Sequence, residues 1–544
     1  MGTERQELTA GHRASGLLAR AGRALSPLAV SALLLAAVPA FAQSDGSYSQ
    51  ETARKVFATG LDNLSSVYIR KVNLGTFATE ALKGLATVDP SFSVEQRNGR
   101  VHLTVASAGV ADFTAPGDDN AGGWADLMAR AVGAARTHSY PLNAEAPEKL
   151  YQAVFDAGMT SLDKYSRYAG ADTARENRAS REGFGGIGIR LDNDNGTVIV
   201  QSVLPNTPAE KAGLKANDKI LRVASRPTNG MELKDVVSLM RGKVGSPLAL
   251  EVEREGNGQP LRFDIKRALI VPPTVTLTKA DDIAEIKITS FNHDTGISLS
   301  NILDGLRNGK NGKTSGIVLD LRNNPGGLLD QAVVVSDLFL TSGQIVSTRG
   351  RHPDSTQLFN ATGRDAAKGL PVVALINGSS ASAAEIVAGA LQDRGRAVLV
   401  GTGSFGKGSV QTVIRMPNDG ELTLTWAHFH APSGYSINRL GVFPVICTSP
   451  AVPASQGLAE AISQGNLRSM VDLTQRRAAD AFAETGKDEL HKVCPYQSGS
   501  TSSASVNGVP PADSEMQVAK ALLRQPELYQ RALKQSVPSL AARQ

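Results

Sequence analysis

The chain has 544 residues, too many for one ordinary domain of roughly 100–200 residues, so three or four domains are expected. Hydrophobic residues make up 41% and charged residues 20% of the chain, which excludes a wholly disordered protein and a polytopic membrane protein. Lys and Arg number 57 against 52 for Asp and Glu, without a basic run, so nucleic acid is not expected as a partner. Two cysteines exclude a disulfide-rich scaffold but permit one bridge.

Residues 1–42 have the pattern of a secretory signal peptide. Four arginines precede the apolar run from Leu28 to Val38, and Ala40-Phe41-Ala42 supplies small residues for cleavage. The run is about a dozen residues long, too short to span roughly 30 Å of hydrocarbon. We therefore expect export to the periplasm or cell envelope, where thiols can oxidise. A retained signal anchor is the alternative.

Residues 43–178 are expected to form a mainly helical N-terminal region. Apolar residues recur at helical spacing in four stretches, Ala53 to Val67, Thr76 to Leu85, Trp124 to Arg136 and Glu145 to Asp163. Alternating residues around Asn98-Gly99 predict a β-hairpin. Because the region carries no recognisable chemical motif, we expect it to serve as a scaffold or dimerisation surface.

Residues 179–270 have the order of short strands, glycines and one helix that resembles a PDZ domain. Gly-Gly-Ile-Gly is followed in order by Ala-Gly-Leu, Asp-Lys-Ile-Leu and an expected helix at Leu233 to Arg241. In PDZ domains a glycine-rich loop binds the C-terminal carboxylate of a peptide, which adds a strand to the sheet edge. The resemblance assigns this loop to Gly185, Gly186, Ile187 and Gly188.

Residues 271–447 alternate strands and helices, which predicts an α/β core with active residues at strand ends. The expected strands include Gly316 to Leu321, Val372 to Ile376 and Ala397 to Gly401. Beyond the core, 448–497 are expected to be a helical extension, 498–514 a linker, and 515–544 one amphipathic helix with a tail. The expected fold class is thus multidomain α+β.

Three segments of the core carry the candidate chemistry. The strand at 372–376 leads through Asn-Gly-Ser-Ser-Ala-Ser into a helix, whose free N–H groups favour an oxyanion. A glycine-bound loop after the strand at 397–401 holds Lys407, and a lysine becomes a useful base only when desolvated. Asp-Leu-Arg-Asn-Asn-Pro-Gly-Gly ends the strand at 316–321 with glycines that let backbone N–H groups approach a ligand. Alone, these segments could be a helix N-cap, a surface lysine and a turn.

Together they resemble the carboxyl-terminal processing, or tail-specific, proteases, which are serine peptidases with a Ser/Lys dyad and an embedded PDZ domain. The resemblance covers about Gly158 to Ile446 and implies a ClpP/crotonase-like core. By motif position it makes Ser382 the nucleophile, Lys407 the general base and Gln411 the residue that orients it. It assigns the oxyanion hole to the N–H groups of Gly327 and Ala383.

The resemblance implies protein or peptide substrates with accessible C-termini, and no metal or organic cofactor. It leaves open an activating or adaptor protein and the formation of a homo-oligomer. A catalytically silent PDZ-containing binding or chaperone-like protein of the cell envelope is the alternative, although every catalytic position is filled. His428 and His430 share a strand face, and we expect them to face solvent rather than hold a metal. Cys447 and Cys494 are candidates for one disulfide in an exported protein.

Overall fold

The computed structural model describes residues 48–280, 282–309, 313–468, 470–471, 473, 491–495 and 513–537. The expected signal peptide at 1–42 and nearly all of the expected linker at 498–514 lie outside these residues. No helix within the described ranges has the length and apolarity needed to cross a membrane.

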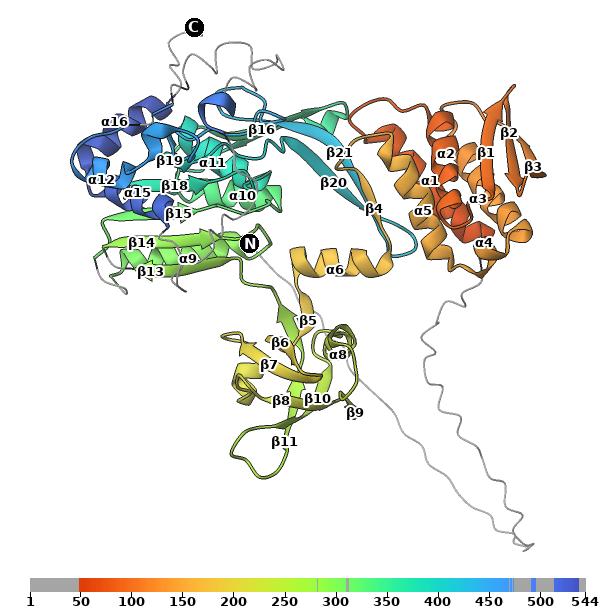
Figure 1. The fold of residues 1–544 in the computed structure, drawn as a ribbon, viewed down its shortest axis with the longest axis horizontal. Helices are drawn as coiled ribbons and strands as arrows, with labels where there is room; N and C mark the ends of the chain where they lie inside the picture. The colour runs from red at the N-terminus through yellow and green to blue at the C-terminus, as the bar shows by residue number, and fades with distance from the viewer. Residues whose placement is uncertain are drawn as a thin grey trace, which may run out of the picture. The chain divides into compact units, whose positions relative to one another are not determined.

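The N-terminal region contains the four expected helices together with a small sheet (Figure 1). Its elements are α1 (Gln50–Ser66), α2 (Leu74–Leu82), η1 (Lys83–Thr87), β1 (Phe92–Arg97), β2 (Arg100–Val105), β3 (Ala108–Thr114), α3 (Ala121–His138), α4 (Tyr140–Ala144), α5 (Pro147–Thr160), β4 (Arg167–Ala169) and α6 (Ala171–Glu182). The expected hairpin is confirmed, with Arg97 opposite Arg100, and β3 adds a third strand that the sequence pattern did not predict.

The N-terminal region shares its hydrophobic core with a long hairpin formed by β20 (Ser409–Arg415) and β21 (Glu421–His430). Met416, Leu422 and Leu424 of this hairpin are buried among the apolar residues of the helices. Strand β4 also pairs with β21. The segment around β4 is therefore fixed to β21, the partner of strand β20 that follows the Lys407 loop.

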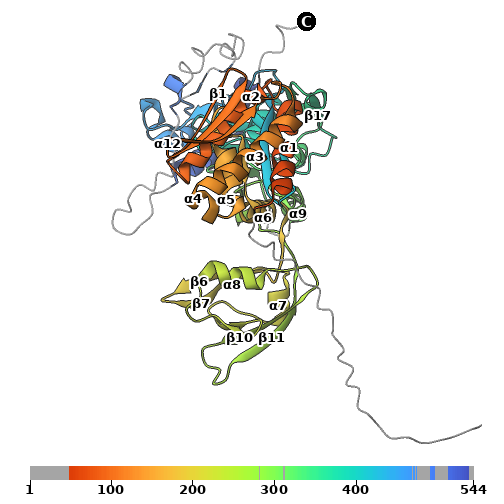
Figure 2. The same cartoon turned by 90° about the vertical axis from the view of Figure 1, so that its right-hand side faces the viewer.

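The PDZ-like module has a hydrophobic core of its own (Figure 2). Its elements are β5 (Phe184–Gly186), β6 (Ile189–Asp194), β7 (Thr197–Val203), α7 (Pro208–Ala212), β8 (Lys219–Val223), β9 (Arg226–Pro227), α8 (Leu233–Met240), β10 (Pro247–Glu253), β11 (Leu261–Lys266) and β12 (Ala268–Ile270). The main sheet has the order β11-β10-β8-β7-β6, which leaves β6 at one edge. Helix α8 contacts β6, so this edge and the helix lie beside each other.

The α/β core is built on a six-stranded sheet of order β13-β14-β15-β18-β19-β22. Its elements are β13 (Val275–Ala280), β14 (Ile283–Ile288), α9 (Thr295–Arg307), β15 (Gly316–Asp320), α10 (Leu329–Asp337), β16 (Gln344–Gly350), η2 (Pro353–Ser355), β17 (Gln357–Asn360), β18 (Val372–Ile376), α11 (Ala383–Asp393), β19 (Ala397–Gly401) and β22 (Ile446–Cys447). Strands β14, β15, β18, β19 and β22 run parallel to one another, whereas β13 pairs with β14 in the antiparallel direction. The segments that follow β15, β18 and β19 therefore meet at one sheet edge.

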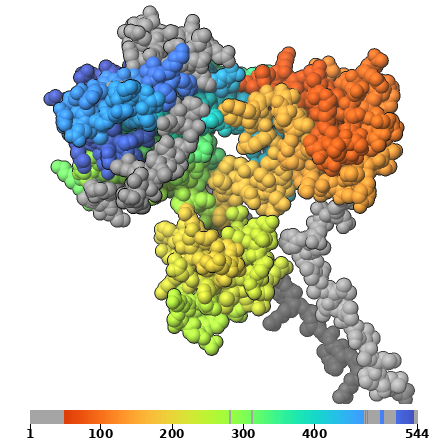
Figure 3. Space-filling view, viewed as in Figure 1, coloured from red at the N-terminus to blue at the C-terminus, as the bar shows by residue number. Residues whose placement is uncertain are grey.

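Helix α12 (Leu458–Ser463) follows the core, and the described residues 513–537 form two helices, α15 (Ser514–Leu523) and α16 (Pro526–Ser536). The expectation of one helix here is wrong, because Pro526 lacks the N–H that a continuing helix needs and instead starts the second helix. The helices share the hydrophobic core of the α/β sheet. In Figure 3 the blue C-terminal residues lie together on the left of the view. Arg322, just after β15, pairs with Asp513 and Glu515 at the start of α15.

A disulfide joins Cys447 of β22 to Cys494, and their Cα atoms are 5.8 Å apart. Both cysteines are buried. The bond ties the segment at 491–495 to the edge of the central sheet.

Candidate active site

Ser382 lies at the junction between β18 and α11, in a strained backbone conformation. Its φ is 55° and its ψ is −116°, at the N-cap of α11. A non-glycine residue with positive φ costs free energy and persists only where its surroundings fix it. Ser382 N–H donates to Glu385 Oε2 at 2.7 Å, and the preceding Ala381 N–H donates to Asn324 O at 2.9 Å. The turn that carries Ser382 is thus held from both sides.

Two glycines follow β15, of which Gly326 lies directly against this serine and Gly327 lies against the backbone of Phe291. Gly326 and Gly327 have φ values of 101° and 149°, which favour glycine. A Cβ on Gly326 would lie 2.8 Å from the Cβ of Ser382. Gly326 N–H donates to Asn324 Oδ1. Ala383 is the first residue of α11, so its N–H has no hydrogen-bond partner within the helix. The structure therefore brings the glycine segment, Ser382 and Ala383 together.

Glu385 connects the serine turn to the lysine loop. It is fully buried, and the N–H groups of Ser382 and Lys407 donate to the same oxygen, Oε2, at 2.7 and 2.9 Å. Its other oxygen accepts bonds from Ser404 Oγ and from Gly406 N–H at 2.7 Å. Burial raises the pKa of Glu385 to about 7, although these four donors act in the opposite direction. The sequence pattern around Glu385 does not by itself indicate this link.

Lys407 is half-buried, and its ammonium lies 5.1 Å from the centroid of the Tyr165 ring. Burial lowers its pKa, nearby Arg167 lowers it further, and Glu385 opposes the change. Within the described part of the chain, no hydrogen bond joins Lys407 Nζ to Ser382 Oγ. The structure thus places a desolvated lysine near the serine turn without a direct contact between the two side-chain tips.

Gln411 lies on β20 and does not contact Lys407 through a hydrogen bond in the described residues. Its Nε2 donates to Ser409 Oγ at 2.8 Å and to Thr425 Oγ1 at 3.3 Å. Tyr165, whose ring lies near Lys407, comes from the N-terminal region, for which a scaffold or dimerisation role was expected. The Asp163-Lys-Tyr-Ser166 pattern, in which an Asp can bind N–H groups two and three residues later, could have marked this turn.

The expected carboxylate-binding residues occupy two kinds of position in the PDZ-like module. Gly185 and Gly186 belong to β5 and pair with β12. Ile187 is buried, and Gly188 has a φ of 86° with Thr207 packed against it. Ile187 and Gly188 directly precede the edge strand β6.

The two histidines of β21 are not solvent-facing as expected. His430 is buried and His428 is half-buried, so the face of β21 that carries them is covered by other parts of the chain. Burial lowers the pKa of both side chains. No cluster of three or more potential metal-ligating His, Cys, Asp or Glu side chains occurs among the described residues.

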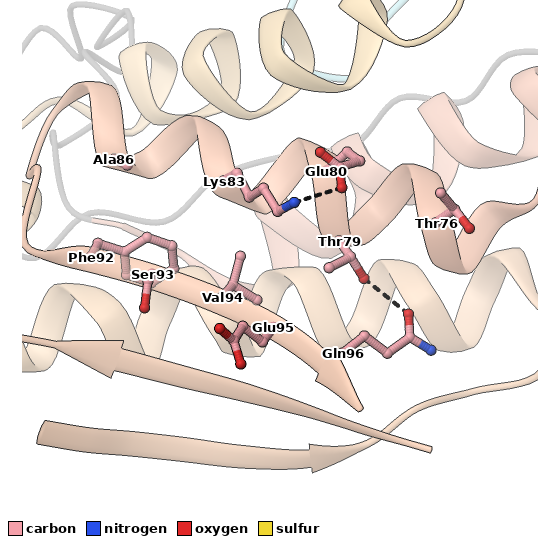
Figure 4. A pocket seen from close by; sticks show the side chains of 10 residues that line it. All are labelled: Thr76, Thr79, Glu80, Lys83, Ala86, Phe92, Ser93, Val94, Glu95 and Gln96. Atoms are coloured by element: carbon pink, nitrogen blue, oxygen red, sulfur yellow. Dashed lines mark hydrogen bonds and ion pairs between the residues drawn. The ribbon is translucent and has the colours of Figure 1, made fainter. Parts of the chain in front are cut away.

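Two cavities differ in their relation to these residues. One of about 540 Å³ is lined by Lys164, Tyr165, Phe405 and Gly406, beside the lysine loop. Another of about 660 Å³ lies between α2 and β1, where Thr79 bonds Gln96 and Lys83 pairs with Glu80 (Figure 4). Because its lining comes entirely from residues 76–96, the second cavity is separate from the candidate active site.

Comparison with known proteins identifies two families along the chain. The model of peptidase family S41 matches residues 282–447, and the PDZ domain model matches residues 175–253. A carboxy-terminal-processing protease of Bartonella bacilliformis is 38% identical over 380 residues, covering 69% of this chain and 83% of that protein. The carboxy-terminal processing protease CtpA of Bacillus subtilis is 35% identical over 302 residues, covering 55% of this chain and 64% of that protein.

Two solved structures are similar to parts of this chain. The photosystem II D1 C-terminal processing protease is 26% identical, covers 57% of this chain and 87% of that chain, and has a TM-score of 0.33. The PDZ domain of a carboxy-terminal protease from Vibrio cholerae, solved with a peptide, is 30% identical. It covers 16% of this chain and 96% of that chain, with a TM-score of 0.16.

Proposed function

Because this chain belongs to peptidase family S41, as a carboxy-terminal-processing serine protease, we propose that it cleaves peptide bonds with Ser382 as nucleophile and Lys407 as general base. The observation that supports this assignment best is the single Glu385 oxygen that accepts the N–H groups of both residues. A shared acceptor holds the backbones of a nucleophile and its base in a fixed relation, as positioned catalysis requires.

The mechanism begins with Lys407 as a neutral amine. Its lowered pKa increases the neutral fraction at a given pH, and the long side chain can rotate from Tyr165 toward Ser382. The amine accepts the Ser382 hydroxyl proton while Oγ attacks the scissile carbonyl carbon. The N–H groups of Gly327 and Ala383 hold the developing oxyanion. The ammonium then donates its proton to the leaving amine, and water hydrolyses the acyl-enzyme.

The Ser382→Ala variant tests the nucleophile. A tagged model substrate incubated with the wild-type chain should yield discrete fragments by mass spectrometry, whereas Ser382→Ala should yield none above background, since no acyl-enzyme can form. Ser379→Ala serves as the matched control from the same turn and should keep its fragments. Equal fragmentation by wild type and Ser382→Ala would assign the chemistry to another residue.

The PDZ-like module is proposed to select substrates by their C-terminus. Strand β6 lies at the edge of its sheet beside α8, which suits the addition of a peptide strand. The segment from Gly185 to Gly188 would receive the terminal carboxylate through backbone N–H groups. An exported, periplasmic or envelope location fits this role, and the buried disulfide suits an oxidising compartment.

Amidation of a substrate's C-terminus tests this recognition. An amide lacks the negative charge that N–H groups bind, so degradation should slow by about tenfold or more, as expected for the loss of hydrogen bonds to a charged group. The measurement compares initial rates for free-acid and amidated forms of one peptide sequence. A peptide in which one internal Glu is replaced by Gln controls for the loss of one negative charge away from the C-terminus. Equal rates for the two termini would rule out carboxylate-based delivery.

A further inference from the structure

The ring of Tyr165 contacts the ammonium of Lys407 from a segment far away in the sequence. The distance from Lys407 Nζ to the ring centroid is 5.1 Å, within the range of a cation–π contact. Tyr165 precedes the PDZ-like module, whereas Lys407 follows β19. The half-buried ring also lines the cavity beside the lysine loop.

The backbone of Tyr165 is fixed by a neighbouring carboxylate. Asp163 Oδ1 accepts the N–H groups of Tyr165 and Ser166 at 2.8 and 3.0 Å, and Asp163 Oδ2 accepts Ser166 Oγ–H at 2.7 Å. Three bonds to one side chain leave this turn little freedom. The ring is therefore presented to Lys407 from a rigid support.

The same carboxylate connects this turn to the proposed orienting residue. Thr425 Oγ1 donates to Asp163 Oδ1 at 3.1 Å, and Gln411 Nε2 donates to Thr425 Oγ1 at 3.3 Å. Thr425 N–H also donates to Ser166 Oγ at 3.1 Å. Hydrogen bonds thus connect Gln411 through Thr425 to the Asp163 turn, and that turn carries the Tyr165 ring that contacts Lys407.

An aromatic face attracts an ammonium but has little attraction for a neutral amine. Such a ring would hold the protonated lysine in one orientation and release the neutral amine to accept a proton. It would also restrict a side chain whose four rotatable bonds otherwise make its position costly to fix. Lys164 contacts the same ring at 4.9 Å but is exposed to solvent.

We propose that Tyr165 is a positioning residue for the general base: its ring holds the protonated side chain of Lys407 beside the serine turn, and from there the neutral amine is released toward Ser382. This inference rests on the proposed function of Lys407. It adds Tyr165 and the Asp163 carboxylate that fixes its backbone, both upstream of the PDZ-like module, to the groups that prepare the active site.

The test compares variants of Tyr165 that lack the aromatic ring with one that keeps it. In the full chain, Tyr165→Leu should lower kcat on a free-acid peptide by roughly ten- to hundredfold, with KM changed by less than about threefold, as expected when positioning is lost but binding persists. Tyr165→Phe keeps the aromatic face and should retain kcat within about threefold of wild type. Tyr165→Met, which fills a similar volume without a ring, provides a second disruptive variant if Tyr165→Leu does not fold.

Two parallel variants separate this inference from its premise. Lys164→Met removes the other cation on the ring and should leave kcat within about twofold, since that lysine is exposed. If Lys407→Ala is inactive while Tyr165→Leu and Tyr165→Met match wild type, the role of Tyr165 is overturned and the dyad stands. If Tyr165→Phe is as slow as Tyr165→Leu, the ring contact is likewise rejected. An active Lys407→Ala would instead reject the proposed base.

Discussion

Replacing Lys407 with alanine is expected to lower kcat by about a thousandfold or more, because nucleophile and base act as one catalytic unit. Peptide binding by the PDZ-like module and the melting temperature should persist, since the lysine side chain makes no hydrogen bond in the described residues on which folding depends. Peptide hydrolysis under saturating substrate gives the rate, and Ser382→Ala gives the background. Activity close to that of wild type would remove Lys407 from the mechanism.

Lys407→Arg provides a sharper control than alanine. Arginine keeps the positive charge and the cation–π contact with Tyr165, but its guanidinium does not lose a proton at accessible pH. It should therefore be as inactive as alanine if a neutral base is required. In the wild type, kcat/KM should rise with pH through an apparent pKa below that of free lysine, because burial and Arg167 disfavour the ammonium.

Local patterns predicted the strands and helices that carry the dyad. Strand β18 has the expected bounds, Val372–Ile376, because a fully buried apolar run ends at residues that favour a turn. Helix α11 begins at Ala383 as expected, since small residues and a glutamate in its first turn suit a helix start. The end of β18 and the start of α11 were thus predictable from local sequence patterns alone.

The contacts that join distant segments were not predictable in this way. Tyr165 reaches Lys407 only because β4 and β20 both pair with β21, a register that no local pattern contains. His430 alternates like a solvent-facing strand residue, yet it is buried, because other parts of the chain cover its face of the sheet. Sequence periodicity reports which residues share a face and not what covers that face.

Replacement of Glu385 is expected to damage both activity and stability. Its two oxygens accept four donors, three of them backbone N–H groups from the serine turn and the lysine loop. In Glu385→Gln one acceptor oxygen becomes an NH₂ donor, which faces N–H groups that can no longer be satisfied. Leaving buried donors unpaired costs about 1–3 kcal/mol each, so the free energy of unfolding should fall by about 2–4 kcal/mol.

The same substitution should lower kcat/KM by about a hundredfold or more, because the serine turn and the lysine loop lose their shared acceptor. Chemical denaturation and peptide hydrolysis measure the two effects separately. Glu421→Gln is a matched control, since this buried glutamate pairs with Arg178 and Arg181 away from the dyad. If Glu385→Gln loses stability but keeps wild-type kcat, the carboxylate supports the fold without positioning the dyad.

The pH dependence of stability gives an independent check on Glu385. Its pKa is raised from 4.5 to about 7 in the folded protein, so the folded state binds this proton more tightly than the unfolded state does. The stabilisation is present below pH 4.5 and is lost as the pH rises through about 7. Glu385→Gln has no such proton, so the difference in unfolding free energy between wild type and variant should shrink across this range. A difference that grows with pH would mean that the four donors outweigh burial and keep the carboxylate charged.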